Sequence, residues 1–198
     1  MIKRTKDAPD RRVARTQMAL RDALHSLVRE KDYDDIAVKE ILDRADIGRS
    51  AFYSHFRDKD DLLASTIHDI IGPVRFAKRE SGGSQSDKLL WFSLPIFEHH
   101  DGHRWTSPLK MGPRARAILH ERLRKILVGL IGQQVKKSRR EKRGESGTIP
   151  TAVLVEYLAS TFILVLEWWL ETRSPLSADQ ANHLFRSLVQ STLTANGL

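Results

Sequence analysis

Apolar residues recur every three or four positions along almost the whole chain, and the alternation of apolar and polar residues that marks a half-buried strand is nearly absent. Such spacing places the apolar side chains on one face of a helix. The sequence therefore predicts an all-α fold of about nine helices. At 198 residues, 40% of them hydrophobic, the chain is long enough for one domain or two small ones with a real core.

Helix start and stop signals divide the chain into four segments. They are a flexible basic arm (1–10), a group of three helices (11–57), a connecting helix (58–80) and a helical C-terminal domain (81–198). Asp58 is suited to cap the connecting helix, and Gly72 and Pro73 end or kink it because proline lacks an amide donor. The Gly- and Ser-rich stretch at 80–87 indicates where the last segment begins.

Four helices are expected in the C-terminal domain: 88–99 with a bend at Pro95, 113–137, 151–171 and 178–195. Pro113 and Pro150 suit helix starts, and Ser177 with Gln180 matches a capping box. The segment 152–170 is apolar on nearly every side, so it has to be buried all round. A central position in the core would bury it, and pairing with a second copy of the chain would do so more easily.

Composition and motifs argue against several classes of protein. The chain has no cysteine, its first ten residues lack the apolar core of a signal peptide, and its longest apolar stretch is interrupted by Glu156 and Glu167. We therefore expect a soluble, cytoplasmic protein without a membrane partner. The sequence contains no P-loop, dinucleotide fingerprint, nucleophile elbow or HExxH, so we expect neither enzyme activity nor a cofactor.

Two polar runs invite a binding role. HHDGH at His99–His103 contains metal-ligand types, but it lacks helical HxxxH spacing and cysteine, which favours a solvated loop over a metal site. KKSRREKR at Lys136–Arg143 contributes to a net charge of +8 and is compatible with a polyanionic partner, although such runs are usually solvated loops. Charge alone therefore does not locate a binding face.

The stretch GRSAFYSHFRDKDDLL (Gly48–Leu63) combines aromatic and charged residues within a few turns of chain. Two short helices are expected around it, at 38–45 and 49–56, and the three residues between them give the spacing of a helix-turn-helix. Phe52 and Phe56 lie four positions apart and share the face that turns to the core. The opposite face carries hydrogen-bond donors that suit DNA: Arg49, Ser50, Tyr53 and His55.

The longer stretch IAVKEILDRADIGRSAFYSHFRDKDDLL (36–63), with the helix before it, resembles the DNA-binding domain of TetR-family transcriptional regulators. Seven positions match the family segment FYxHFxxKxxLL: Phe52, Tyr53, His55, Phe56, Lys59, Leu62 and Leu63. Three positions depart from the common pattern. Ala37 stands where a capping Thr is usual, so Asp35 could cap the helix instead. Asp46 replaces the turn Gly, and Gly48 replaces a capping Ser.

The resemblance implies roles for individual residues. Contacts to DNA phosphates carry over by position to Lys39, Ser50, Tyr53, His55 and Lys59, and base contacts to Arg49 and Ala51. Arg49, at the start of the third helix, could bond a guanine with both ends of its guanidinium. The basic arm either follows the minor groove or is a frayed terminus.

The resemblance also implies a C-terminal domain that forms a homodimer and holds a small-molecule effector. We expect dimerisation through 153–170 and 184–193, and hence a palindromic operator on double-stranded DNA. The candidate pocket residues are large apolar side chains: Trp91, Phe92, Trp105, Met111, Leu119, Tyr157, Phe162 and Trp168. Glu156 and Glu167, eleven positions apart on nearly one face, would meet a cationic ligand, Arg116 and Arg122, or water.

The function that follows is a dimeric, sequence-specific transcriptional regulator, in this family most often a repressor that a small-molecule effector releases from DNA. The alternative is a DNA-bound coactivator or scaffold that needs a partner protein and no ligand. The EWWLE segment at 167–171 resembles TetR relatives of that second kind, which regulate dihydroxyacetone kinase genes.

Overall fold

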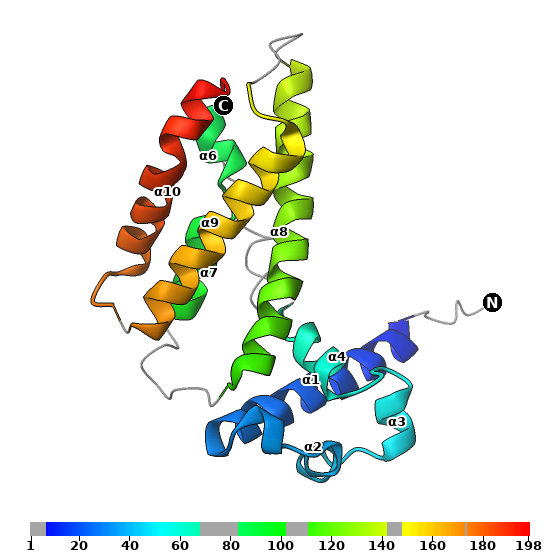
Figure 1. Cartoon of the computed structure of the whole chain (residues 1–198). Helices are drawn as coiled ribbons and strands as arrows, with labels where there is room; N and C mark the ends of the chain where they lie inside the picture. Colours follow the sequence, from blue (N-terminus) through cyan, green and yellow to red (C-terminus); the bar gives the residue numbers. More distant parts are fainter. Residues whose placement is uncertain (1–6, 68–82, 102–110, 142–147, 173) are drawn as a thin grey trace, which may run out of the picture. The chain divides into compact units, whose positions relative to one another are not determined.

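The structure, a computed structural model, describes residues 7–67, 83–101, 111–141, 148–172 and 174–198 (Figure 1). Within these ranges the chain forms nine α-helices and one short 3-10 helix, and it contains no strand. The all-α prediction is confirmed. The chain divides into two compact units, residues 1–67 with 108–119 and residues 68–107 with 120–198.

The N-terminal unit contains α1 (Asp7–Glu30), the 3-10 helix η1 (Tyr33–Asp35), α2 (Val38–Ala45), α3 (Arg49–Tyr53), α4 (Lys59–Ser65) and the first turns of α8 (Pro113–Glu141). α1 begins at Asp7, so four of the ten positions assigned to the basic arm belong to a helix. Pro9 lies in the first turn, where a helix needs no amide donor. The rest of the arm and the predicted break at Gly72 and Pro73 lie outside the described residues.

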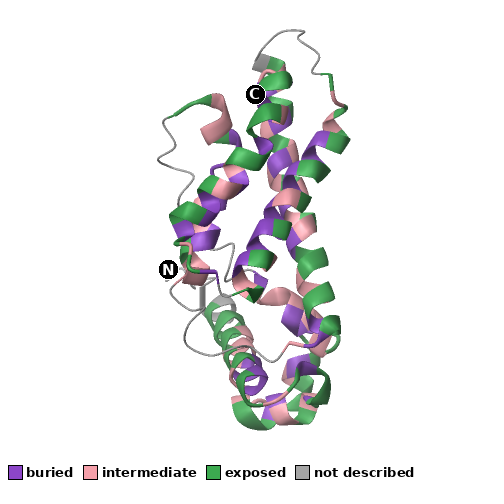
Figure 2. Cartoon of the chain, turned by 60° about the vertical axis from the view of Figure 1, so that its left-hand side comes forward, coloured by how far each residue is buried: buried purple, intermediate pink, exposed green. Residues whose placement is uncertain are grey.

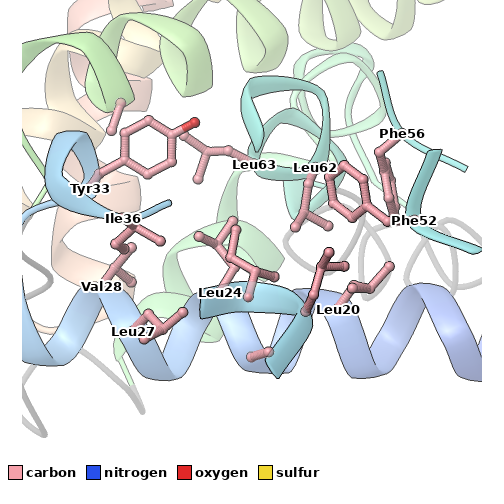
Figure 3. Close-up of a cluster of buried hydrophobic side chains, with 14 residues drawn as sticks. Leu20, Leu24, Leu27, Val28, Tyr33, Ile36, Phe52, Phe56, Leu62 and Leu63 are labelled. Atoms are coloured by element: carbon pink, nitrogen blue, oxygen red, sulfur yellow. The ribbon is translucent and has the colours of Figure 1, made fainter. Parts of the chain in front are cut away.

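The core of this unit consists of side chains that face inward from its helices (Figure 3). Its buried apolar cluster includes Leu20, Leu24, Leu27, Val28, Ile36, Ile41, Phe52, Phe56, Leu62 and Leu63. Burying one large apolar side chain stabilises a fold by about 1.5–3 kcal/mol. Several such anchors therefore hold α3 and α4 against α1.

The start of α8 belongs to this core, although the sequence placed everything after residue 81 in the C-terminal domain. Ala115 is fully buried in the cluster, and Met111, Ile118 and Leu119 pack against it. Ile118 and Leu119 follow Ala115 by three and four positions, so these three side chains share one face of α8. The start of α8 therefore groups with the N-terminal helices, because periodicity identifies an apolar face but not the core that the face fills.

Three elements of the unit meet at one carboxylate. The Tyr33 hydroxyl of η1 donates to Asp60 Oδ1 of α4 at 2.5 Å, and Arg114 Nη2 of α8 donates to Asp60 Oδ2 at 2.6 Å. Burial raises the pKa of Tyr33, and the bond to the Asp60 carboxylate raises it further. Burial opposes the charge of Asp60, but the bonds from Tyr33 and Arg114 outweigh it and hold the pKa of this carboxyl below its ordinary value.

The turn between α2 and α3 contains a residue in the left-handed region. Asp46 ends α2 with φ 53° and ψ 46°, and the Ile47 amide donates to Leu42 O at 3.1 Å. Aspartate tolerates this conformation better than most residues, so the turn forms without a glycine. After Ile47, Gly48 has an ordinary extended backbone and occupies the N-cap position of α3 without a capping side chain.

The C-terminal unit contains α6 (Gln85–Leu89), α7 (Ser93–Asp101), the rest of α8, α9 (Thr151–Glu171) and α10 (Ala178–Ala195). The helices predicted to start at Pro113 and after Pro150 and Ser177 are confirmed. The helix predicted at 88–99 is instead two helices separated at 90–92. Ser84 caps α6 by accepting from the Asp87 amide, and Pro95 lies in the first turn of α7, where it requires no bend.

Aromatic rings fill the centre of the C-terminal unit. The fully buried rings are Phe92, Phe97, Phe162, Trp169 and Phe185. Their centroids lie 5.2–5.4 Å apart in the edge-to-face geometry that aromatic pairs favour. Beside them a 2.6 Å hydrogen bond joins the buried Ser93 and Asn182 and fixes α7 against α10.

Helix α9 is buried on one side only. Among the described helices it alone has the length and apolarity of a membrane span, and half of its most apolar window is buried inside the unit. Along the helices of the unit, exposed positions alternate with buried ones (Figure 2). A helix that packs in an α-helical core passes the same test of composition, and the buried side of α9 packs in this way, whereas the expected burial on every side is not found within one chain.

Asp46→Gly should raise the free energy of unfolding of the N-terminal unit by about 0.5–1 kcal/mol, because glycine adopts the left-handed region without the steric cost that aspartate carries. Native-state hydrogen exchange of the α2 amides measures the change. Asp43→Gly, inside α2, is the matched control and should lower stability by about 0.3 kcal/mol. A loss of stability in Asp46→Gly would contradict the expected strain.

Asp60→Asn should lower the stability of the N-terminal unit by about 1–2 kcal/mol at neutral pH, because two charge-assisted bonds weaken. The pKa of Asp60 is lowered in the folded state, so its contribution is complete above the unfolded value of about 3.9 and disappears as the pH falls through the folded value. Urea titrations of both proteins from pH 3 to pH 7 test this. A difference that stays constant to pH 3 would exclude the carboxylate as its source.

Candidate nucleic-acid interface

Helix α2 begins without a capping side chain. Ala37 occupies the N-cap position, so the alternative cap Asp35 is not used. The carboxylate of Glu40 reaches back and accepts from the Ala37 amide at 2.9 Å, which satisfies one of the orphan donors of the helix start. Glu40 therefore compensates for the missing Thr hydroxyl.

Ion pairs join α2 to α1 and to the segment before it. Arg44 donates to both carboxylate oxygens of Glu30 at 2.8 and 2.9 Å, and to Ser26. Lys31 donates to Glu40 at 2.6 and 2.8 Å. The bond from Arg44 lowers the pKa of Glu30, and the bond from Lys31 lowers that of Glu40. These two cations are used within the protein, and they fix the orientation of α2 on α1.

Helix α3 is held by its phenylalanines. Phe52 is fully buried and Phe56 nearly so, and their rings lie 5.9 Å apart. The buried face is the one predicted from the four-residue spacing. Because α3 has only five residues, one fixed side chain determines which of the others face outward.

The opposite face of α3 presents donors to solvent. Arg49 and Ser50 are exposed at the start of the helix, and 54% of Tyr53 is exposed at its end. Ala51 and His55 are half-buried, while Lys39 of α2 is exposed. Six of the seven predicted DNA-binding residues thus lie on α2, on α3 or directly after α3, and four of them are exposed.

Lys59 differs from the other six. Its ammonium donates to the carbonyl oxygens of Tyr33 at 2.9 Å, Asp34 at 3.2 Å and Ile36 at 2.9 Å. No sequence pattern indicates these contacts, because the acceptors are main-chain atoms 23 to 26 positions away. The phosphate contact that the resemblance implies for Lys59 stays a prediction.

Seven of the eight candidate pocket residues are described, and they are divided between the two units; their role in a ligand pocket stays a prediction. Met111 and Leu119 pack against the core of the N-terminal unit. Phe92 and Phe162 belong to the aromatic centre of the C-terminal unit, and Trp91 is also buried there. Tyr157 and Trp168 are 38% and 41% exposed on α9, and Trp105 lies outside the described residues. The large apolar residues therefore lie in the core of the N-terminal unit, in the core of the C-terminal unit and on the exposed side of α9.

The two carboxylates of α9 pair with α8. Glu156 accepts from Arg124 at 2.8 and 2.9 Å, and Glu167 lies 3.0 Å from His120. Of the three alternatives expected for these carboxylates, pairing with basic residues of α8 is observed, with Arg124 and His120 in place of Arg116 and Arg122. The neighbouring Glu121 also bonds Arg124, and this bond with that of Lys125 lowers the pKa of Glu121 to about 2.

The two polar runs are partly described. His99 and His100 lie in the last turn of α7 with ring centroids 5.5 Å apart, and the described residues contain no group of three metal-ligand side chains. From the basic run, Arg139 bonds the Thr151 hydroxyl at 2.5 Å and Ile149 O at 2.7 Å, which fastens the start of α9. Residues 142–147 lie outside the description.

Known proteins match the N-terminal part of the sequence. Residues 20–66 match the family described as bacterial regulatory proteins, tetR family. YxbF of Bacillus subtilis (strain 168), an uncharacterized HTH-type transcriptional regulator, is 41% identical over 59 residues. That match covers 29% of this chain and only 16% of the relative's length.

Solved structures match almost the whole chain. A TetR transcriptional regulator from Streptococcus agalactiae 2603V is 26% identical with a TM-score of 0.55, and the match covers 93% of this chain and 99% of that one. FadR from Bacillus subtilis, solved in complex with stearoyl-CoA, is 17% identical with a TM-score of 0.59 over 91% and 98% of the two chains, a likeness of fold. Residues 20–66 thus match the tetR family of regulatory proteins, and almost the whole chain has the fold of a TetR transcriptional regulator, with a helix-turn-helix and a helical C-terminal unit.

Proposed function

We propose that this chain binds double-stranded DNA as a homodimer and regulates transcription from a palindromic operator. The observation that supports this most directly is α3, which buries Phe52 and leaves Arg49, Ser50 and Tyr53 exposed. A short helix with donors on its outer face suits the major groove of B-DNA. Two such helices related by a two-fold axis would read two half-sites.

The proposed DNA-binding residues form two groups, those that contact phosphates and those that contact bases. Lys39, Ser50, Tyr53 and His55 would contact phosphates, which position the protein on the duplex and carry no sequence information. Arg49 would reach a base edge, and Ala51 would contact a base or a thymine methyl group. The resemblance implies a phosphate contact for Lys59 as well, but its ammonium bonds three carbonyl oxygens of the protein, so we leave it out of this set.

The proposed dimer uses the face of α9 and α10 that the unit leaves uncovered. Val153, Leu164 and Leu188 are 57%, 65% and 49% exposed. On α9 the exposed positions 153, 157, 160, 164 and 168 follow helical spacing and form one stripe. Contiguous exposed apolar residues at the surface of a folded unit indicate a protein interface.

Charge is depleted on the same face. From His183 to Ala195, α10 contains a single formally charged residue, Arg186, and this side chain bonds Asp87 at 2.6 Å within the unit. In a chain with 29% charged residues, a helix face without exposed charge is unusual. Depletion of charge characterises the centre of protein–protein interfaces.

Release by a small-molecule effector is the regulatory scheme we favour. FadR of similar fold was solved with stearoyl-CoA, which supports a ligand in the C-terminal unit of this fold. One effector would stabilise a dimer whose two α3 helices do not fit successive major grooves. DNA and effector would then weaken each other's binding by the same factor.

One observation favours the alternative of a DNA-bound coactivator or scaffold that needs a partner protein. The described part of the C-terminal core is closely packed, with five fully buried aromatic rings in mutual contact. In that case DNA affinity would not respond to a small molecule. Either protein would act in the cytoplasm, where bacterial DNA lies.

Arg49→Ala should change base preference, while Tyr53→Phe should weaken binding to every duplex by a similar factor. Losing a bidentate base contact costs about 1–3 kcal/mol at one position, and losing one hydroxyl about 0.5–1.5 kcal/mol without sequence dependence. Selection of bound sites from random duplexes, followed by affinity measurements at fixed salt, compares the two variants. An unchanged base preference in Arg49→Ala would remove this residue from base recognition.

Leu164→Glu should convert the dimer to a monomer, because a carboxylate would be buried without a partner at the centre of the exposed stripe. Sedimentation velocity at micromolar concentrations measures the mass. Met18→Glu is a matched control, because Met18 is an exposed apolar residue of α1 (54%) outside the stripe and its variant should stay dimeric. If Leu164→Glu has the same mass as the unaltered dimer, the interface lies elsewhere.

A further inference from the structure

Four successive carbonyl groups converge between α1 and α2. Lys59 donates to those of Tyr33, Asp34 and Ile36, and Lys31 donates to that of Asp35 at 3.0 Å. An ammonium has three protons, so the three acceptors of Lys59 satisfy it completely. The stem of Lys59 also places its nitrogen 4.5 Å from the centre of the Tyr33 ring, a cation–π contact.

Lys59 and its carbonyl acceptors lie at opposite ends of the helix-turn-helix. Ile36 directly precedes Ala37, the N-cap residue of α2, and Lys59 is the first residue of α4. Between them lie 22 residues, 37–58, which make up α2, the turn and α3. The bond from Lys59 to Ile36 O therefore joins the two ends of the helix-turn-helix.

The adjacent residue strengthens the same connection. Asp60 accepts from the Tyr33 hydroxyl, so α4 holds both the backbone and the side chain of η1. The path from η1 leads directly to Ala37 and the first turn of α2, where Lys39 is exposed. Loss of the Lys59 contact would free this end of α2 and change the position of Lys39 relative to α3.

We propose that Lys59 is a positioning residue, which closes the helix-turn-helix and contacts no phosphate. It acts through α2 by keeping Lys39 in register with the donors of α3. The effect of Lys59 on DNA affinity rests on the proposed function. The contact that closes the helix-turn-helix rests on the geometry alone.

The salt dependence of binding separates the two roles of a lysine. Each phosphate contact contributes about 0.9 to the slope of log K against log salt, through release of a counterion. With a duplex selected by the unaltered protein, Lys39→Met should lower the slope by about 0.9. Lys59→Met should lower the affinity about tenfold and leave the slope unchanged. A slope reduced by about 0.9 in Lys59→Met would overturn the proposal.

Lys59→Arg provides the second comparison. Arginine keeps the charge, but its planar fork cannot direct three donors to carbonyl groups that converge on one point. The affinity of Lys59→Arg should therefore fall as in Lys59→Met. Recovery of the full affinity by arginine would show that the charge alone matters, as a phosphate contact requires.

A double-variant cycle distinguishes positioning from general destabilisation. If Lys59 acts through Lys39, then Lys39→Met should cost less affinity in the Lys59→Met protein than in the unaltered one. Additive losses would contradict this coupling.

Hydrogen exchange of the free protein decides the structural part without DNA. Lys59→Met should accelerate exchange of the amides at 37–41, and Lys39→Met should not. Unchanged exchange in Lys59→Met would exclude the closing contact. If the unaltered protein bound no duplex at all, the proposed function would fail, and this exchange measurement would still decide the role of Lys59.

Discussion

The burial of Phe52 is the constraint on which the proposed DNA interface depends. A helix of five residues is not stable in isolation, because nucleation fixes several backbone angles for few hydrogen bonds. Helix α3 therefore exists because its phenylalanine is enclosed by α1 and α4. The same burial sets the rotation of the helix, and rotation decides that Arg49, Ser50 and Tyr53 lie outside.

Cations in the N-terminal unit fall into two groups that composition cannot separate. Lys31, Arg44, Lys59 and Arg114 bond partners within the protein. Lys39 of α2 and Arg49 of α3 are exposed. A net charge of +8 counts both groups equally. The first group determines the shape of the helix-turn-helix, and the second group is available to a polyanion.

Helix α9 places its aromatic residues on two different surfaces. Its sequence is apolar almost all round, and the structure uses the two sides differently. Phe162 and Trp169 fill the aromatic centre, while Tyr157 and Trp168 remain exposed on the stripe assigned to the dimer. Glu156 and Glu167 of the same helix pair with Arg124 and His120 of α8. A helix that serves a core and an interface needs apolar residues on both faces.

The sequence alone determined the features that depend on neighbours a few positions apart. Helix periodicity, the capping box at Ser177 and the inward face of Phe52 and Phe56 follow from spacings of three or four residues, and the structure contains them. Only the tertiary structure decided that the start of α8 joins the N-terminal core and that Arg114 meets Asp60, 54 positions away. It also decided that Lys59 bonds carbonyl groups of η1. Periodicity specifies which face of a helix is apolar, whereas the partner of that face, or of a charge, is set by how distant segments pack.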